Sequence, residues 1–353
     1  MVFHYLQRLG AYTGYRGARF LRKNHLPLRS FSCETIIHAP EERGYCPPPV
    51  TLDGQLERAT GNFWSPLSGV IKNAVETENT HTATILYKID NVTVDNGFLY
   101  KGGNADYLSS LGPPKFEKPR HKTEGVLCSS PAGSLYFGCW MYGDNLLDGI
   151  AKERDQYAIK VMPHKNYFHL PEANQILNLS DHYLTQPTTF DHLYIVDDGG
   201  YNKNKVERIK NLRKLYEKSA SSIKEKNRYV YLERGKSANP RILSNEKEIT
   251  DYLASCGFKI INPEHMTFSE IADEIVGCEI VMGVEGSQFT HGLLGVKEGG
   301  YVIQLEPPYH FQPTDRPRCE SVGVRWGFLV GFENNKGFEI PLDDVKKLLG
   351  KIL

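Results

Sequence analysis

The chain has 353 residues, of which 40% are hydrophobic and 24% are charged, and its 42 Lys and Arg residues equal its 42 Asp and Glu residues. This balance is typical of a folded globular protein and excludes the disordered and fibrous classes. The length predicts two domains, because single hydrophobic cores stop growing near ~250–300 residues. The zero net charge gives no general attraction to nucleic acid, so any basic site must be local.

Two further exclusions follow from the distribution of residue types. The sequence contains no run of about 18 apolar residues and no apolar signal segment, so we expect a cytoplasmic protein. The seven cysteines are widely spaced and include no C-x-x-C pair. They fit a reducing compartment, and they predict neither a disulfide framework nor a zinc site.

The first 24 residues are a local exception to the even charge. They mix aromatic and leucine residues with Arg8, Arg16, Arg19, Arg22 and Lys23. Such a composition can lie on an anionic membrane surface, which predicts peripheral binding to the inner face of the cell membrane. The plainer alternative is a solvated arm, because three glycines in this stretch weaken any helix.

The first half of the chain predicts strands that alternate with helical segments. Residues 83–102 read as a hairpin, because the pair Asn96-Gly97 between two β-rich runs tolerates the positive φ of a tight turn. The stretches 125–130, 156–163 and 192–198 read as further strands. A glycine-spaced segment, 131–151, looks helical in its second half. This alternation predicts a layered α/β domain.

The second half alternates more regularly. Strands are expected at 228–233, 258–261, 279–284 and 301–307, and helices at 245–257, 267–277 and 287–299. The second helix opens with a capping box, Thr267 and Glu270. Such a series predicts a doubly wound parallel sheet with its ligand crevice at the carboxyl ends of the strands.

The domain boundary is expected near residue 200, within the polar, glycine-rich stretch 197–205. We therefore expect an N-terminal domain at 1–200 and a C-terminal domain at 201–353. A closing helix at 341–353 is expected, in a position where it can pack back on the N-terminal domain.

The stretch VMGVEGSQFTHGLL, residues 281–294, forms a predicted strand-to-helix turn. Free backbone N–H groups of Gly286, Ser287 and Gln288 would suit a diphosphate there. Arg234 and Arg241 follow a strand that ends at the same edge, and two guanidiniums can neutralise a diphosphate. The alternative for these arginines is a solvated loop. Asn245 is a second polar candidate, with a simpler role as a helix N-cap.

These segments together resemble a known enzyme family. A block with Arg234, Arg241 and Asn245-Glu246 precedes PEHMTFSE (263–270) and then GVEGSQFTH (283–291). Upstream lie the hairpin YKIDNVTV (87–94) and YFGCWMYGDNLL (136–147). This combination resembles glycosyltransferase family 61, which includes plant β-1,2-xylosyltransferases, the EGF-domain O-linked N-acetylglucosamine transferase and bacterial enzymes of surface-polysaccharide synthesis. The resemblance implies a GT-B architecture with two Rossmann-like domains that face a central cleft.

The resemblance also implies roles for individual residues. The donor would be a nucleoside-diphosphate sugar, a UDP-sugar first of all, bound by the C-terminal domain with no obligatory metal and no other cofactor. Thr290 would join the arginines, Asn245 and the 286–288 turn in the donor site. Asp144 would be the catalytic base, with an ordinary acid in a helix's first turns as the alternative. Cys139, Trp140 and His291 would line the acceptor side or the cleft.

Three positions depart from the pattern that the resemblance implies. Relatives commonly have His at the positions of Glu285 and Cys139, and many have Glu at the position of Gln304. We expect Glu285 to read donor hydroxyls or to act in catalysis. Asp197 and Asp198 read as a turn and not as a metal-binding pair, so no metal site is expected.

The leading hypothesis is an inverting glycosyltransferase that acts on a glycan acceptor in cell-surface polysaccharide synthesis. One alternative is a sugar-nucleotide epimerase on the same scaffold, in which Glu285 would be catalytic. Another is a non-catalytic glycan-binding member, motivated by Cys139 in place of a histidine. The expected partners are the nucleotide sugar and the glycan acceptor, and no nucleic acid.

Overall fold

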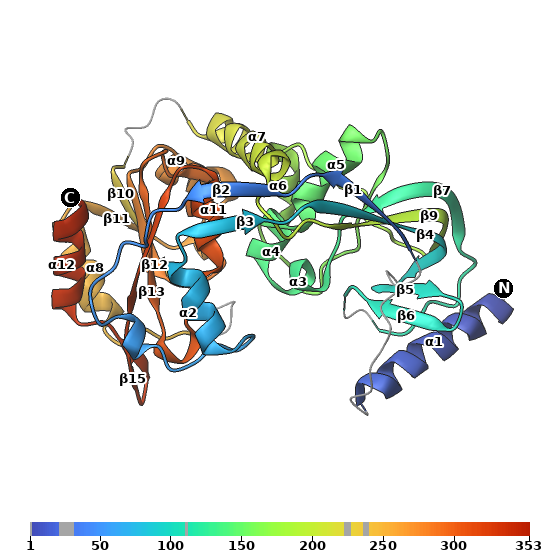
Figure 1. Cartoon of the computed structure of the whole chain (residues 1–353), viewed down its shortest axis with the longest axis horizontal. Helices are drawn as coiled ribbons and strands as arrows, with labels where there is room; N and C mark the ends of the chain where they lie inside the picture. Colours follow the sequence, from blue (N-terminus) through green and yellow to red (C-terminus); the bar gives the residue numbers. More distant parts are fainter. Residues whose placement is uncertain (1, 21–31, 110–111, 222–226, 236–239) are drawn as a thin grey trace. The chain divides into compact units, whose positions relative to one another are not determined.

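The computed structural model describes residues 2–20, 32–109, 112–221, 227–235 and 240–353 (Figure 1). The chain divides into two compact units. Unit 1 comprises Met1–Glu41 and His81–Arg208, and unit 2 comprises Glu42–Thr80 and Ile209–Leu353. Residues 42–80 therefore fold with the C-terminal part of the chain. The division of acceptor and donor roles between 1–200 and 201–353 stays a prediction.

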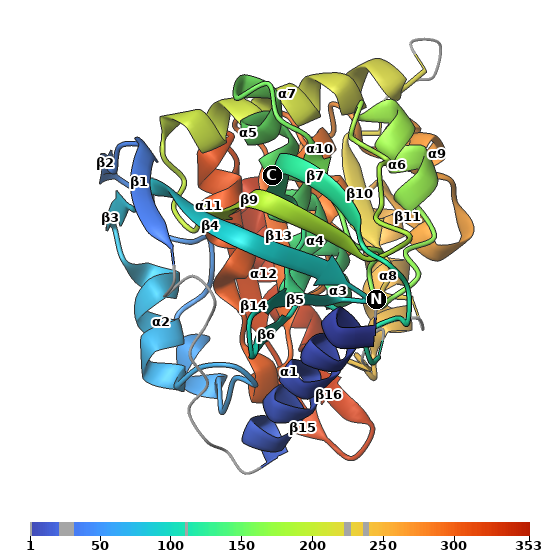
Figure 2. The same ribbon diagram turned by 90° about the vertical axis from the view of Figure 1, so that its right-hand side faces the viewer.

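Unit 1 is built on a mixed sheet. Within its described residues the strand order is β6-β5-β4-β9-β7-β8, and β1 also pairs with β4. Strands β8, β7 and β9 run parallel, whereas β4 is antiparallel to its neighbours. Figure 2 shows β4, β9 and β7 side by side. The strands are β1 (Cys33–His38), β4 (Thr84–Asp95), β5 (Phe98–Lys101), β6 (Asn104–Tyr107), β7 (Arg120–Leu127), β8 (Ala158–Ile159) and β9 (Thr188–Asp197).

The predicted hairpin at 83–102 is confirmed. It joins β4 to β5 through Asn96 and Gly97, whose φ angles are 44° and 84°. Both values are positive, as a tight turn that matches the strand twist requires.

Helices of unit 1 lie mainly between β7 and β9. The glycine-spaced segment is helical from its start and not only in its second half, because Ser130 caps its first turn by accepting a hydrogen bond from the N–H of Gly133 at 3.0 Å. The helices are α1 (Val2–Phe20), α3 (Pro131–Leu135), α4 (Phe137–Tyr142), α5 (Leu147–Glu153) and α6 (Leu170–Ile176), with a 3-10 turn η3 (Asp144–Leu146). Helix α7 (Lys203–Ser219) begins in unit 1 and continues into unit 2, whose second segment starts at Ile209.

The expected solvated arm is instead the helix α1, which packs on the β5–β6 edge (Figure 2). Ala11 is buried beside Phe98, and the ring of Tyr12 meets Phe98 at 5.1 Å between centroids. Arg8 is 4% exposed and pairs with Asp95 at 3.1 Å. These contacts outweigh the cost of about 1 kcal/mol per helical glycine.

The buried Arg8 is therefore not available to a membrane surface, which corrects its place among the expected membrane-binding residues. Arg16 is exposed. Arg22 and Lys23 lie outside the described residues, as does the side chain of Arg19. In the described part of the chain, no helix is long and apolar enough to cross a membrane.

Unit 2 contains the parallel sheet that the sequence predicts. In its described residues the order is β11-β10-β12-β13-β14, and each neighbouring pair is parallel. The α/β fold class is thus confirmed, and β14 is an additional strand. The strands are β10 (Tyr229–Leu232), β11 (Phe258–Ile261), β12 (Ile280–Val284), β13 (Tyr301–Glu306) and β14 (Arg325–Val330).

The helices of this sheet follow the sequence closely. The capping box of Thr267 and Glu270 is present, and Gly257 has a φ of 87°, as a helix stop requires. The helices are α2 (Leu67–Val75), α8 (Glu246–Ser255), α9 (Phe268–Ile275), α10 (Phe289–Gly295), α11 (Arg316–Ser321) and α12 (Leu342–Ile352), with 3-10 turns η2 (Leu56–Arg58), η4 (Pro263–His265), η5 (Pro308–His310) and η6 (Pro313–Asp315).

Segment 42–80 and the closing helix both pack within unit 2. Val50 forms a parallel bridge to Gly327 of β14. The apolar face of α12 joins the core that includes Leu253 of α8. Asp344 of α12 pairs with Arg58 at 2.7 Å. Arg58 lies within the range 1–200 that was expected to form the N-terminal domain, but it belongs to unit 2. Two short pairs complete the strands: β2 (Glu41–Tyr45) with β3 (Glu78–His81), and β15 (Phe332–Asn334) with β16 (Gly337–Glu339).

Candidate active site

The topology of unit 2 creates a crevice at one edge of its sheet. The chain leaves β10 toward β11 on one side and then returns to β12 on the other side of β10. Ligands of doubly wound folds bind outside the carboxyl ends of the strands at such a switch point. Arg234 follows β10 by two residues, and Glu285 follows β12 directly. The topology therefore brings together two of the predicted site residues.

Both predicted arginines converge on Glu285. Arg234 Nη1 donates to the backbone carbonyl of Glu285 at 2.5 Å, and Arg241 Nη1 donates to the same oxygen at 3.0 Å. Arg241 also forms an ion pair with the Glu285 carboxylate. Burial and the nearby Arg241 charge lower the pKa of Arg234 to about 10, so the guanidinium stays positive at neutral pH. Two cations in one buried place favour an anionic ligand.

Free backbone donors lie next to these cations. Among the described residues, none accepts a hydrogen bond from the N–H groups of Gly286, Ser287 or Gln288. A Cβ on Gly286 would lie 1.6 Å from Arg234 Nη1, so glycine is required for the close approach of the guanidinium. Three N–H groups and two guanidiniums thus surround one short turn. Oxygen-rich anions such as a diphosphate are the ligands that such donors prefer.

A second carboxyl group, Glu306, lies at the carboxyl end of β13. It is fully buried, and one of its oxygens accepts from the N–H of Gln312 at 3.1 Å. The other oxygen has no hydrogen-bond partner among the described residues. Burial, followed by the charge of Glu285, raises the pKa of Glu306 well above its usual range. Glu306 is not among the predicted site residues, although its place at the end of a predicted strand could have indicated it.

Burial also raises the pKa of Glu285, whereas the Arg241 and Arg234 charges act in the opposite direction. A negative charge on Glu285 therefore disfavours a negative charge on Glu306. Of the pair, Glu285 is the one in contact with a cation, so it carries the charge more readily.

His310 is likewise not among the predicted site residues. It is buried in η5, which follows β13, and its Nδ1 accepts from the N–H of Phe63 at 3.2 Å. Burial and then the charges of Arg241 and Arg234 lower its pKa to about 4. The imidazole is therefore neutral at physiological pH and lies within electrostatic range of both arginines. No local motif marks it, because its neighbours come from distant parts of the chain.

Asn245, a predicted donor-site residue, and Gln304, a position that departs from the family pattern, have protein partners of their own. Asn245 donates to the carbonyl of Ile340 at 2.8 Å and accepts from its N–H at 3.3 Å, which ties α8 to the start of α12. The sequence predicted a side-chain N-cap for Asn245, but no capping hydrogen bond is present, because the amide is engaged by Ile340. The Gln304 side chain accepts from Trp326 Nε1 at 2.6 Å and donates to the Asp315 carboxylate at 2.9 Å. These two hydrogen bonds explain how the buried amide of Gln304 is tolerated in the core.

His291 belongs to α10, and its side chain is buried. Its Nδ1 lies 3.4 Å from the hydroxyl of Tyr216, and its ring lies 5.1 Å from that of Phe268. The ring is therefore covered by its neighbours in unit 2, and its expected place at the acceptor side or the cleft stays a prediction. Thr290, one residue earlier, is also buried, and its hydroxyl has no hydrogen-bond partner among the described residues.

Asp144 occupies a comparable place in unit 1. The chain leaves β7 for β8 on one side and later returns to β9 on the other side of β7, which makes a switch point at the carboxyl end of β7. Ser130 follows that end of the strand. Asp144 Oδ2 accepts from the N–H of Ser130 at 3.1 Å. Burial raises the pKa of Asp144 to about 7, although the Ser130 hydrogen bonds and Lys160 act in the opposite direction. A carboxylate with this pKa suits a general base at neutral pH.

The neighbouring predicted residues Trp140 and Cys139 lie on α4. Trp140 is buried, with its ring 5.4 Å from that of Phe137 and 5.8 Å from that of Tyr167. This packing leaves almost no indole surface for an acceptor, so Trp140 supports the segment that carries Asp144. Cys139 is half-buried on the same short helix.

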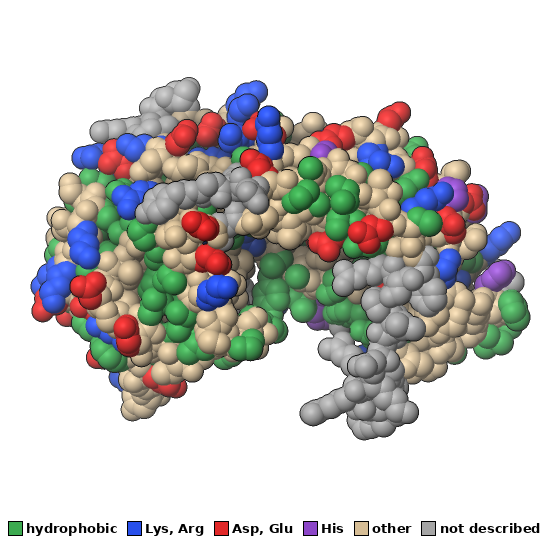
Figure 3. Space-filling view, viewed as in Figure 1, with side chains coloured by type: hydrophobic (Ala, Val, Ile, Leu, Met, Phe, Trp, Pro, Cys, Tyr) green, Lys and Arg blue, Asp and Glu red, His purple; other side chains and the backbone are tan. Residues whose placement is uncertain are grey.

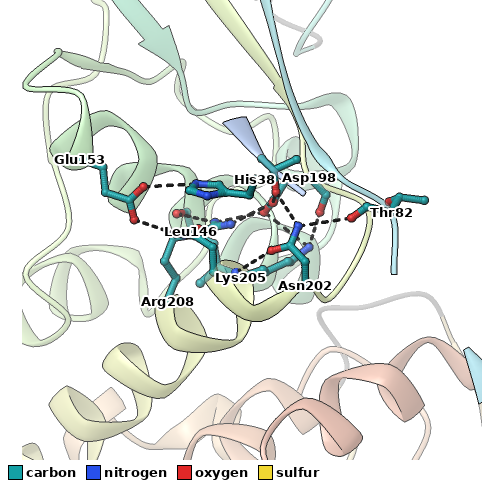
Figure 4. A network of polar contacts seen from close by, with 10 residues as sticks. His38, Thr82, Leu146, Glu153, Asp198, Asn202, Lys205 and Arg208 are labelled. Carbon is teal, nitrogen blue, oxygen red and sulfur yellow. Dashed lines mark hydrogen bonds and ion pairs between the residues drawn. The ribbon is translucent and has the colours of Figure 1, made fainter. Parts of the chain in front are cut away.

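Asp198, which follows the end of β9, is paired with cationic and hydroxyl groups of unit 1. The side chain of Asp198 is 6% exposed, and it accepts from Arg208 at 2.9 and 3.1 Å (Figure 4) and from Thr84 at 2.8 Å. Its carboxylate is therefore already neutralised within unit 1. Within the described ranges, no group of three or more His, Cys, Asp or Glu residues is placed to hold a metal ion.

Comparison with known proteins identifies the class. The sequence matches the model of the family described as Glycosyltransferase 61 over residues 92–303. This span includes Asp144, both arginines and the 286–288 turn. A search of curated proteins finds no match. The chain belongs to glycosyltransferase family 61, and its class of activity is glycosyl transfer.

Proposed function

We propose that the protein is an inverting glycosyltransferase whose donor is a nucleoside-diphosphate sugar, with UDP-sugars as the first to test. One observation carries the proposal: Arg234 and Arg241 meet at the Glu285 carbonyl, beside three N–H groups for which no described residue is an acceptor. The family match supports the transfer of a sugar. The cluster lies at the switch point of a doubly wound sheet, where such folds bind nucleotides.

In the proposed reaction, an acceptor hydroxyl attacks the anomeric carbon of the donor sugar. The bond from the acceptor oxygen to that carbon forms while the bond from the carbon to the diphosphate breaks, and attack from the opposite face inverts the configuration. Asp144 takes the proton of the hydroxyl. Negative charge grows on the departing diphosphate, and Arg234, Arg241 and the 286–288 N–H groups stabilise it.

The remaining assignments belong to the same proposal. Glu285 reads hydroxyl groups of the donor, and Thr290 adds a hydroxyl to that side of the site. The two units form a GT-B architecture, as the family resemblance implies, with unit 2 as the donor side. The acceptor is a glycan of the cell surface. On the face of the molecule drawn in Figure 3, acidic and basic side chains are interspersed, so this face gives no general attraction to a highly charged polymer.

Incubation with a panel of nucleoside-diphosphate sugars tests the proposal. Release of nucleoside diphosphate with a glycosylated acceptor, or slow donor hydrolysis without one, is the expected result. Formation of an isomeric nucleotide sugar would instead indicate an epimerase, and absence of both binding and turnover would indicate a non-catalytic member.

A matched pair of variants links the activity to the site. Arg241→Ala should lose turnover, because it removes a guanidinium beside the 286–288 turn. Arg228→Ala should keep it, since Arg228 precedes β10 at the opposite edge of the same sheet and pairs with Glu279 at 2.8 Å. Equal turnover in the two variants would contradict the placement of the donor site.

A further inference from the structure

A short segment of unit 2 presents two large aromatic side chains to solvent. Phe63 is 58% exposed, and Trp64, the next residue in the same loop, is 62% exposed. Aromatic side chains of this size are usually buried in a core or reserved for binding. The exposed part of Phe63 is apolar surface left in water, so it is available to a ligand.

The loop is held in place by hydrogen bonds to the segment after β13. The carbonyl of Pro308 accepts from the N–H of Gly61 at 3.1 Å, and the carbonyl of Gly61 accepts from the N–H of Phe311 at 3.0 Å. Asn62 donates to the carbonyl of Phe311 at 2.7 Å. Asn62 Oδ1 also accepts from the N–H groups of Trp64 and Ser65, at 2.8 and 3.0 Å, which closes the turn. Phe63 is therefore presented by a fixed backbone.

The position of Phe63 relates it to the anion site. Its ring stacks on the imidazole of His310, with centroids 4.2 Å apart and planes 16° apart. His310 lies in the segment after the carboxyl end of β13, at the same sheet edge as the Glu285 turn. Strand β13 pairs directly with β12, and the N–H of Glu285 donates to the carbonyl of Leu305 at 3.0 Å, so the segment that carries His310 begins beside the Glu285 turn.

We propose that the exposed face of Phe63 stacks on the base of the nucleoside diphosphate whose diphosphate Arg234 and Arg241 bind. This inference rests on the proposed function, since it assigns a further part of the same ligand. A base is joined to its diphosphate through a single ribose, so an aromatic surface close to a diphosphate site fits a nucleotide. The π face of Phe63 accepts any base, so the stack contributes affinity without choosing the nucleotide.

Comparison of UDP with inorganic pyrophosphate isolates the stacking. Both ligands are titrated by calorimetry into the full chain and into Phe63→Ala. The variant should bind UDP about tenfold or more weakly, which is within the range for the loss of one stacked base, and it should bind pyrophosphate as the wild type does. Phe63→Leu, which keeps apolar bulk but removes the ring, guards against a folding defect and should also weaken UDP binding alone. Phe116→Ala is the control, because Phe116 is 57% exposed in unit 1.

The outcomes separate the two proposals. If the wild type binds neither UDP nor pyrophosphate, the proposed function fails. If it binds both with equal affinity, or if the Phe63 variants lose both or neither, the diphosphate site stands and the base-stacking proposal is wrong. Unchanged UDP affinity with a raised KM for the acceptor would assign Phe63 to the acceptor and would also overturn the proposal.

Discussion

A single atom of Arg241, Nη1, makes both of its contacts with Glu285: it donates to the backbone carbonyl at 3.0 Å and forms an ion pair with the side-chain carboxylate. The carbonyl contact fixes the guanidinium beside the 286–288 turn. The carboxylate contact places a negative charge where the proposed ligand would bring its own. Binding of a diphosphate therefore requires Arg241 to exchange one anionic partner for another.

The first prediction concerns the guanidinium itself. Arg241→Ala should weaken UDP binding by about 1–3 kcal/mol, the range for hydrogen bonds to charged groups, while the fold stays intact. Calorimetric titration measures the affinity, and circular dichroism checks the fold. Unchanged affinity in a folded variant would remove Arg241 from the site.

The second prediction concerns the carboxylate. Glu285→Gln keeps the shape and removes the charge that pairs with Arg241, so UDP should bind several-fold more tightly at neutral pH. Transfer should nevertheless fall, by about tenfold, since the carboxylate that reads donor hydroxyls is lost. Titration with UDP and steady-state kinetics with the sugar nucleotide measure the two effects. Weaker UDP binding together with full transfer would contradict both roles of Glu285.

The third prediction follows from the pKa of Asp144, which burial raises to about 7 from its ordinary value of 3.8. A base must be deprotonated to act, so kcat/KM should rise with pH through about 7 and then level off. Asp144→Asn should reduce transfer by about a hundredfold or more, abolish that rise and leave UDP affinity unchanged.

Stability gives an independent check on the same group. Because the folded-state pKa of Asp144 lies above the unfolded value, ionisation costs stability as pH rises from about 4 to about 7. The Asn variant does not pay this cost. The free energy of unfolding of Asp144→Asn minus that of the wild type, measured by urea denaturation, should therefore be larger at pH 8 than at pH 4. A variant with normal transfer or an unchanged pH profile would exclude Asp144 as the base.

Local signals in the sequence predicted much of unit 2. The capping box of Thr267 and Glu270 and the stop at Gly257 act over one turn of chain, so their residues suffice to predict α8 and α9. The arginines and the Glu285 turn could be predicted because parallel strands bring their carboxyl ends to one edge. The topology alone then relates these residues in space.

Contacts between distant segments could not be predicted in this way. Phe63 reaches His310 across 247 positions, and no pattern near either residue indicates the pair. The ion pair of Arg8 with Asp95 likewise decides that the first residues form a packed helix. Propensity favoured an arm there because it counts the glycines and not the tertiary contacts.

The fourth prediction concerns α1 and membranes. Arg8→Ala should destabilise the protein by about 3–5 kcal/mol, since it leaves Asp95 buried without its partner. Deletion of residues 1–24 therefore confounds folding with membrane binding. Exposed Arg16, changed to Glu, is the cleaner test: sedimentation with anionic vesicles at low salt should decrease, with stability unchanged. Equal sedimentation of Arg16→Glu and the wild type would leave α1 without a membrane role.

The central claim is that the turn after β12 binds the diphosphate of the donor through its backbone. Hydrogen exchange of the amides of Gly286, Ser287 and Gln288, measured with and without UDP, tests it most directly. The account predicts slower exchange at these amides in the presence of UDP, because phosphate oxygens become their acceptors, and no slowing in Arg241→Ala at the same UDP concentration. Saturating UDP that leaves the exchange of all three amides unchanged in the wild type would contradict it.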